Sequence, residues 1–519
     1  MKTTSKGRKI IWFLSVLLTI LIFLLSSKYY KRIDLTKEKR FSVSDFSCIF
    51  LQNIQEPVKI TYYVSPELTK LYPQTQNIKE FLVAYSQQNS NILFESRNPV
   101  KDGIVEALVA NGIYGHQIQS SQGNKTEYTT VYSAIMIEYL NMTSVIPFIL
   151  SDEKLEYELT LRLLKLVENK SFPVFIMCGN GMSVQQDYSY LIPWLEASGF
   201  TCQEISPQEF VLMNSLGDVK QLNIPLVILG ATMLSKDESE AINDFVSSGG
   251  NVLVMSSAIN ATIYDNWDVS VVESFPFSYV LNRWGIFAGN EIVNDISCFH
   301  MTLYSDDTNP VYESLNYPMW ISSLSQYTSE NPITDKLQKM CFFWSNPINI
   351  NPEVCEVLVY TSPVAWLSEP DYNYNPNYVT NPFVVAQSAS QAGKQENQYA
   401  IATKSKVENG GGTVIFVSDQ YFVSTMLLDY TGSASNLDFV VNSLLSLSNS
   451  DFLLDIRNRS FISTQLNKND IQKLQTDSKK IIFITCVLVP LLPIIIALFI
   501  YMFIKIFNKR EFSKTKETQ

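Results

Sequence analysis

The sequence predicts an α/β protein whose large body lies between one transmembrane helix near each terminus. Residues 10–27 and 481–504 are long apolar segments without a charged residue, and they predict the two helices. About 20 apolar residues span a bilayer, so the second segment is long enough and the first is short. Short apolar strands that alternate with amphipathic helices predict the α/β body between them.

The first apolar segment has the length of a signal peptide, but the residues after it disfavour cleavage. Residues 28–32 are bulky and basic, whereas a cleavage site has small residues. We therefore expect an uncleaved anchor. Basic residues flank both segments on both sides, so charge alone does not decide on which side of a membrane the body lies.

The pattern of strands and helices in the body predicts two α/β domains, the second of them with a parallel sheet. The N-terminal domain has strands at 58–64 and 92–95 around a helix at 78–85, then a hairpin over 130–150. An amphipathic helix is predicted next, at 152–168. The second domain has the following predicted strands and helices: strands 174–177, 200–205, 226–229, 251–255 and 413–417; helices 188–197, 235–247 and 437–447.

The predicted domain organisation follows from these elements. Residues from 256 to about 400 are rich in Asn, Ser, Tyr and Pro and show no clear period, so we treat them as a long irregular insertion. The segments are an N-terminal tail (1–9), a span (10–27), an N-terminal α/β domain (28–150), a second α/β domain (151–460), a juxtamembrane linker (461–480), a span (481–504) and a C-terminal tail (505–519).

Charge excludes nucleic acid as a partner. Residues 41–460 carry 20 basic and 44 acidic side chains, a net charge of −24, which repels phosphate backbones. The basic flanking segments instead predict contact with lipid head groups. The seven cysteines form no C-x-x-C pair, so neither a zinc ribbon nor a thioredoxin motif is predicted.

Catalytic motifs are absent from the sequence. Only His116 and His300 are present, which excludes a histidine-rich metal centre, and no P-loop pattern occurs. The turn Gly179-Asn180-Gly181 follows a strand, but Val184 stands where a dinucleotide loop needs its third glycine. We predict no cofactor and no metal.

Cys178 is the one position with the placement of a nucleophile. It lies where a strand turns into a helix, as in a nucleophile elbow. However, Ile176 and Asn180 occupy the positions where an elbow needs glycine. A thiol hydrolase or amidotransferase that uses Cys178 with His116 or His300 is therefore the less favoured interpretation.

Several segments along the chain carry a resemblance to a known family. They are residues 32–42, 56–63, 145–148, 155–160, 223–229, 245–250, 284–286, 331–334 and 417–422. No single segment is a catalytic signature, and the order of all of them carries the resemblance. Together they resemble the GldG family, the auxiliary component of a gliding-motility-associated ABC transport system.

The resemblance implies a fold and a setting. The second domain would be similar to the class I glutamine-amidotransferase-like fold without its catalytic residues. The body would be extracytoplasmic, on a two-span protein of the cytoplasmic (inner) membrane with both tails inside. The partners implied are a separate ABC permease and a separate ATPase. Members of the family often have Gly-His-Gly-Glu where this chain has Gly179, Asn180, Gly181 and Met182, so both ionisable positions are lost.

The predicted function is therefore a non-enzymatic, substrate-binding-like subunit of an ABC transport system. A membrane-anchored structural or signalling envelope protein is the alternative. Open α/β sheets bind ligands at the carboxyl ends of their strands. The candidate ligand-binding residues in those loops are Asn180, Gly181, Thr232 and Asp419, and turn formation alone would also explain each of them.

Overall fold

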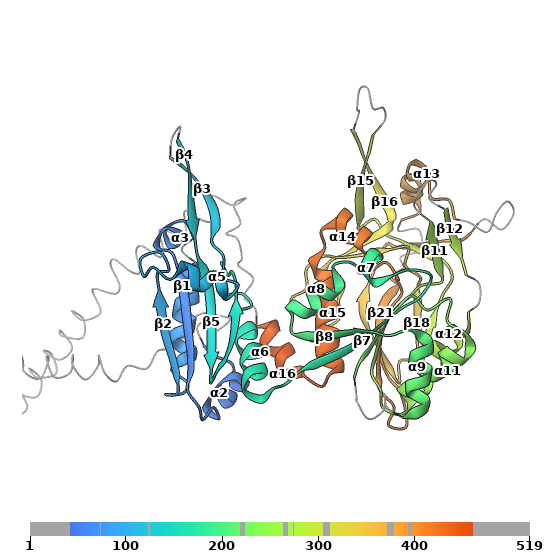
Figure 1. Cartoon of the computed structure of the whole chain (residues 1–519). Coiled ribbons are helices and arrows are strands. Elements are labelled where there is room, and N and C mark those ends of the chain that lie inside the picture. Colours follow the sequence, from blue (N-terminus) through green and yellow to red (C-terminus); the bar gives the residue numbers. More distant parts are fainter. Residues whose placement is uncertain are drawn as a thin grey trace, which may run out of the picture. The chain divides into compact units, whose positions relative to one another are not determined.

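The computed structural model describes most of the chain between residues 42 and 459. Two main sheets organise this part, one of four strands near the N-terminus and one of nine strands (Figure 1). Helices accompany both sheets, so the fold is mixed α/β. The described residues are 42–72, 74–122, 125–217, 224–262, 268–272, 275–304, 312–370, 378–392 and 397–459.

The four-stranded sheet has the order β2-β1-β5-β6. Strand β1 pairs in parallel with β2, and it pairs antiparallel with β5 on its other side. A parallel pair needs a crossover connection, and helices α3 and α4 provide it. The bounds are β1 (Val58–Val64), α3 (Pro66–Leu71), α4 (Thr75–Ser86), β2 (Ile92–Arg97), β5 (Ser133–Tyr139) and β6 (Met142–Ile146).

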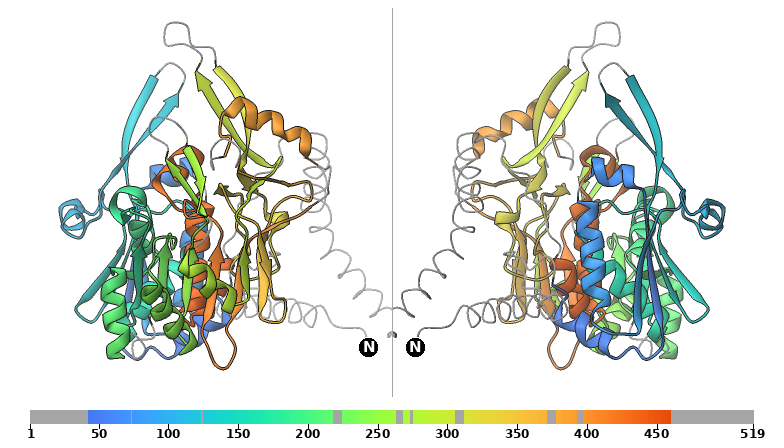
Figure 2. Two further views of the ribbon diagram at one scale, coloured as in Figure 1. Left: turned by 90° about the vertical axis from the view of Figure 1, so that its right-hand side faces the viewer. Right: turned by 90° about the vertical axis from the view of Figure 1, so that its left-hand side faces the viewer.

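Helix α4 packs through one apolar face. Ile78, Phe81, Leu82 and Tyr85 are all buried, and their spacing places them on one side of a helix. Three further elements complete this region: α2 (Asp45–Gln52), α5 (Val105–Ala110) and the hairpin of β3 (His116–Gln122) with β4 (Lys125–Val131). This hairpin is a separate two-stranded sheet, and Figure 2 shows it extending beyond the four-stranded one.

The larger sheet has five parallel strands in the order β8-β7-β9-β10-β22. Strands β9 and β10 are buried at every position, as expected for parallel strands that are covered on both faces. The bounds are β7 (Phe172–Cys178), β8 (Phe200–Glu204), β9 (Leu226–Leu229), β10 (Val252–Met255) and β22 (Thr413–Val417).

Local capping signals set several helix starts in this region. Ser235 caps α11, and Glu238 completes the capping box. Ser206 and Glu209 make the same arrangement at α9. The helices are α6 (Leu155–Glu168), α7 (Val184–Asp187), α8 (Leu191–Ala197), α9 (Pro207–Leu216), α11 (Lys236–Ser247), α14 (Thr425–Thr431), α15 (Ala434–Leu447) and α16 (Asp451–Asn458).

The stretch between β10 and β22 contains short strands that the sequence pattern does not reveal. Some extend the large sheet, and others form smaller sheets, including the long β15–β16 hairpin seen in Figure 2. The elements are β11 (Ile259–Thr262), β12 (Asp268–Val271), α12 (Pro276–Arg283), β13 (Ile286–Ala288), β14 (Ile292–Asn294), β15 (Cys298–Tyr304), β16 (Tyr312–Ser323), β17 (Met340–Phe343), β18 (Ile348–Ile350), β19 (Cys355–Tyr360), β20 (Trp366–Ser368), α13 (Pro382–Gln387) and β21 (Ala400–Lys406).

The structure corrects the predicted membrane architecture. No helix among the described residues is long and apolar enough to cross a bilayer. The longest of them, α6 and α15, have 14 residues each, about 21 Å against a hydrocarbon core of about 30 Å. The predicted spans, residues 10–27 and 481–504, lie outside the described residues. The finding that no described helix could cross a bilayer contradicts the predicted two-span fold class and inner-membrane localisation.

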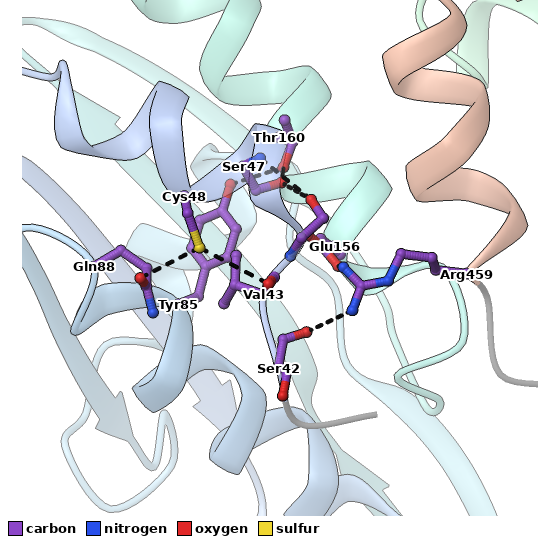
Figure 3. A network of polar contacts seen from close by, with 10 residues as sticks. Ser42, Val43, Ser47, Cys48, Tyr85, Gln88, Glu156, Thr160 and Arg459 are labelled. Carbon is purple, nitrogen blue, oxygen red and sulfur yellow. Dashed lines mark hydrogen bonds and ion pairs between the residues drawn. The ribbon is translucent and has the colours of Figure 1, made fainter. Parts of the chain in front are cut away.

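A buried carboxylate joins the first and last described segments of the chain (Figure 3). Glu156, near the start of α6, is 8% exposed. Its Oε1 accepts a hydrogen bond from the Ser44 backbone N–H at 2.7 Å, and its Oε2 lies 3.5 Å from Nη1 of Arg459. Arg459 also donates through Nη2 to the Ser42 carbonyl at 3.1 Å. One side chain thus links the two ends of the described body.

A chain of hydroxyl groups continues this network towards the four-stranded sheet. The hydroxyls of Ser47 and Thr160 lie 3.0 Å apart, and those of Tyr85 and Thr160 lie 2.9 Å apart. Nearby, the rings of Phe46 and Phe452 stack with centroids 4.0 Å apart. Helices α2, α4, α6 and α16 are therefore tied together by both polar and aromatic contacts.

We expect Glu156→Ala to lower the free energy of unfolding by about 2–4 kcal/mol, because it leaves the buried Ser44 N–H without an acceptor and the Arg459 guanidinium without its ion-pair partner. Glu156→Gln keeps an acceptor for Ser44 and should cost about 1 kcal/mol. Urea denaturation measures both. Glu168→Ala, at an exposed position of the same helix, is the control and should stay within about 0.5 kcal/mol of wild type. Equal losses in all three variants would contradict this role of Glu156.

Candidate functional site

All four predicted site residues follow parallel strands of the large sheet. Asn180 and Gly181 come after β7, Thr232 after β9 and Asp419 after β22. Because the strands are parallel, these loops lie at the same edge of the sheet. We call this edge, with the loops 179–183, 230–235 and 418–424, the carboxyl edge.

The side-chain amide of Asn180 bridges three loops of the carboxyl edge. Its Oδ1 accepts hydrogen bonds from the Thr232 hydroxyl at 2.7 Å and from the Met233 backbone N–H at 3.2 Å. Its Nδ2 donates to Oε1 of Gln420. Asn180 adopts a left-handed backbone conformation, with φ of +57°, which asparagine tolerates better than most residues. Asn180, Thr232 and Gln420 form what we call the Asn180 cluster.

Glycines allow the loops of the Asn180 cluster to approach each other. A Cβ added at Gly179 would lie 2.4 Å from the Gly230 carbonyl oxygen, so no larger residue fits there without a shift of backbone. Gly230 has φ of +76°, and a Cβ there would meet the Asn180 side chain at 2.8 Å. The turn predicted at residues 179–181 is therefore an interstrand contact as well as a βα connection.

Gln420 and Tyr188 belong to this edge but were missed by sequence reasoning. Gln420 Nε2 donates to the Ile259 carbonyl at 3.0 Å, and the Tyr188 hydroxyl donates to the Gln420 carbonyl at 2.8 Å. Gln420 could have been found as the neighbour of Asp419. Tyr188 has no sequence signal that separates it from an ordinary core tyrosine.

Asp419 lies in the interior and does not face the surface. Its side chain is fully buried, with Oδ2 accepting from the Phe343 N–H at 2.7 Å and Oδ1 from the Tyr421 N–H at 2.6 Å. Burial raises the pKa of Asp419 to about 8, although both backbone hydrogen bonds favour the charged form. The carboxylate positions loops, and a ligand at the surface has no direct access to it.

The four predicted site residues differ in their exposure to solvent. Gly181 is exposed, with φ of +71°, while Asn180 and Thr232 are half-buried. The Met233 side chain beside them is 69% exposed. A partner at the carboxyl edge would therefore meet Gly181, Thr232 and Met233, whereas Asn180 and Asp419 hold the loops from within.

Chemistry at the carboxyl edge lacks a paired nucleophile and base. Burial, Asp187 and Glu204 raise the pKa of Cys178 to about 12. His116 lies on β3, with its ring centroid 3.9 Å from that of Phe148, and His300 lies on β15 opposite Asn316. Neither histidine is among the groups that act on Cys178. In the described ranges, no group of three His, Cys, Asp or Glu side chains could hold a metal ion.

Comparison with known proteins places the large sheet within a described family. Residues 173–455 match the model of an ABC-type uncharacterized transport system family, and residues 37–138 match a domain of unknown function (DUF7088). An uncharacterized protein of Borreliella burgdorferi is 25% identical over 283 residues, which cover 54% of this chain and 55% of that protein. The chain thus spans about half the length of the curated relative it matches.

Among solved structures, similarity extends to a protein of Bacteroides uniformis described as ThuA-like. The match covers 53% of this chain and 91% of that one, at 13% sequence identity and a TM-score of 0.28. A TM-score this low does not establish a shared fold.

Titration of Asp419 should make stability fall as pH rises from about 4 to about 8. The folded-state pKa of about 8 lies above the ordinary value of 3.8, so the folded state binds a proton that the unfolded chain releases in this window. The slope from this group is at most about 1.4 kcal/mol per pH unit, and it vanishes above pH 8. Asp419→Asn should remove it.

Urea denaturation at pH 5, 6.5 and 8 measures this effect as the change in the free energy of unfolding with pH. Asp335→Asn, at an exposed carboxylate, serves as the control and should keep the wild-type slope. A slope in Asp419→Asn as steep as in wild type would show that other groups cause the pH dependence.

Proposed function

The chain belongs to the ABC-type uncharacterized transport system family, and we propose that it is a non-enzymatic auxiliary subunit whose α/β body binds a partner or ligand. Family membership implies a permease and an ATPase as partners in general. The family match over residues 173–455, which contain the large sheet and its carboxyl edge, is the observation that carries this proposal.

The geometry of the carboxyl edge supports a binding role over a catalytic one. The Asn180 cluster uses the polar groups of its loops in hydrogen bonds to one another, which fixes the loops before any partner arrives. Preformed loops bind with a smaller entropic cost than mobile ones. The exposed Met233 adds an apolar contact beside Gly181 and Thr232. We therefore place the partner-binding surface at these three residues.

A finer assignment follows from the resemblance to the GldG family. We propose that the transport system is of the gliding-motility-associated type, on the strength of the ordered segments that include residues 145–148 and 155–160. The loop at Gly179–Met182 departs from that family, since it carries neither of the two ionisable residues often found there. Metal or acid/base chemistry in this loop is therefore not part of the proposal.

Affinity purification of the tagged chain from detergent-solubilised cells tests the auxiliary role. An ABC permease and its ATPase should be recovered in a fixed ratio to the chain and be identified by mass spectrometry. Met233→Glu should reduce their recovery, because it places a charge on the proposed contact surface. Leu212→Glu, at a similarly exposed position of α9, should not reduce it.

Two results would contradict this proposal at different levels. Recovery of the chain without any transporter subunit would reject the auxiliary role and favour a free-standing structural or signalling role. The permease and ATPase could also be recovered to the same extent with Met233→Glu as with wild type, or be reduced equally by Leu212→Glu. Either result would be consistent with the auxiliary role but would reject the carboxyl edge as its contact surface.

Alkylation of Cys178 distinguishes binding from thiol catalysis. With its pKa raised to about 12, little thiolate is present at pH 8, and the thiolate is the reactive species. We expect iodoacetamide to modify Cys178 at least about a hundredfold more slowly in the folded chain than in the urea-unfolded chain. Peptide mass spectrometry follows each cysteine separately. Rates within tenfold of each other would revive the hydrolase interpretation.

A further inference from the structure

A pocket of about 400 Å³ lies at the edge of the four-stranded sheet, apart from the carboxyl edge of the large sheet. It is formed where parallel strands β1 and β2 end and where α3 and α4 begin their crossover. We call it the β1–β2 pocket. Ends of parallel strands are the usual position for ligands in open α/β sheets, so its place in the fold suits a binding site.

The β1–β2 pocket carries three positive charges and no negative one. Lys70, Lys79 and Arg97 are among its lining residues, which include no aspartate or glutamate. The first turn of α4, which forms one wall, also has no acidic residue. This contrasts with residues 41–460 as a whole, whose net charge is −24. A concentration of cations in an otherwise acidic body points to an anionic ligand.

Each of the three cations keeps N–H groups that bind no carboxylate among the described residues, although Asp102 already offsets the charge of Arg97. Among the described residues, no carboxylate lies within ion-pair distance of Lys70 or Lys79, and both lysines are exposed. Arg97 pairs with Asp102, but through Nε to Oδ2 at 2.9 Å. That bond fixes the guanidinium and does not involve its two terminal nitrogens, which are the groups that hold a phosphate or carboxylate in a bidentate way.

Polar and apolar groups complete the lining. The Oδ1 of Asn98 accepts from the N–H groups of Val100 and Lys101, so the side chain of this lining residue is held in place. Val64 and Pro66 supply apolar surface. The Tyr62 ring is held by a hydrogen bond of 3.0 Å between its hydroxyl and that of Ser133.

We propose that the β1–β2 pocket binds a small organic phosphate. The cations that line the pocket match a phosphate dianion better than a single carboxylate: Arg97 is already paired with Asp102, and Lys70 and Lys79 together offset two negative charges. The volume of about 400 Å³ exceeds what an inorganic phosphate fills, and the apolar wall accommodates an organic group. The site lies within residues 37–138, which match a domain of unknown function, and outside the transport-family match. It does not depend on the transport role.

Isothermal titration calorimetry of the purified full chain tests the pocket, at fixed ionic strength and pH 7.5, with phenyl phosphate as the probe. Phenyl phosphate should bind at one site per chain. Benzoate, which has the same ring but a single negative charge, should bind at least about tenfold more weakly, since a second charge on the ligand strengthens each charge-assisted hydrogen bond. Phenol should not bind.

Substitutions then locate the site. Lys70→Gln and Lys79→Gln should each weaken phenyl phosphate binding about tenfold. Lys101→Gln, an exposed lysine that does not line the pocket, is the matched control and should bind as wild type does. Far-ultraviolet circular dichroism and the urea midpoint confirm that each variant is folded.

Three outcomes would overturn the proposal: no binding of phenyl phosphate by wild type, benzoate affinity equal to that of phenyl phosphate, or equal weakening by Lys101→Gln. The last would indicate attraction by general surface charge. None of these outcomes bears on whether a permease and an ATPase are recovered with the chain, so failure here and failure of the auxiliary role are distinguishable.

Discussion

The two ends of the described body are held together by one buried carboxylate, and the arrangement around it depends on that contact. Glu156 binds the first segment through the Ser44 N–H and the last through Arg459. It lies on α6, which follows the four-stranded sheet in the chain and precedes the large one. A charge that is 8% exposed is stable in such a place only when its partners are present. Folding therefore has to bring Glu156 into contact with Ser44, which lies 112 positions earlier in the chain.

Polar side chains at the carboxyl edge of the large sheet are likewise hydrogen-bonded within the protein. The Asn180 amide connects loops after β7, β9 and β22, and Asp419 is held by two backbone N–H groups. The neutral amide of Asn180 bridges these loops without the cost of burying a charge, which a charged side chain at this position would carry. The neutral side chain of Asn180 therefore has a structural role: it joins the loops that follow three strands.

Elements with a strong local signal could be predicted from sequence, and elements that depend on distant partners could not. The strands at residues 58–64, 226–229 and 413–417 match β1, β9 and β22 in their bounds, because each is rich in β-branched, aromatic or other apolar residues and has a clear start and end. The strands between 256 and 400 were missed because many have only three or four residues and pair across long separations. For example, β14 pairs with β20, so that Asn294 lies opposite Trp366.

The same distinction applies to the sites. Because ligands bind at strand ends, the sequence predicted that Asn180 and Thr232 lie at one edge. In the structure, the Thr232 hydroxyl lies 2.7 Å from Oδ1 of Asn180. It did not indicate Gln420 or Tyr188, which contribute a side chain and a hydroxyl from positions without a motif. The β1–β2 pocket was missed for a related reason: Lys70, Lys79 and Arg97 come from three separate elements, and each alone resembles an ordinary surface cation.

The contrast between the acidic body and the basic pocket also limits how the pocket can act. At physiological salt, charges more than about 8–10 Å apart in solvent are largely screened. The net charge of −24 on residues 41–460 therefore repels an approaching anion only weakly, while Lys70, Lys79 and Arg97 act on it at contact distance. Attraction confined to contact distance selects by shape and charge geometry within the pocket, since no long-range field draws anions to it. Such selectivity is what distinguishes a ligand site from a generally basic surface.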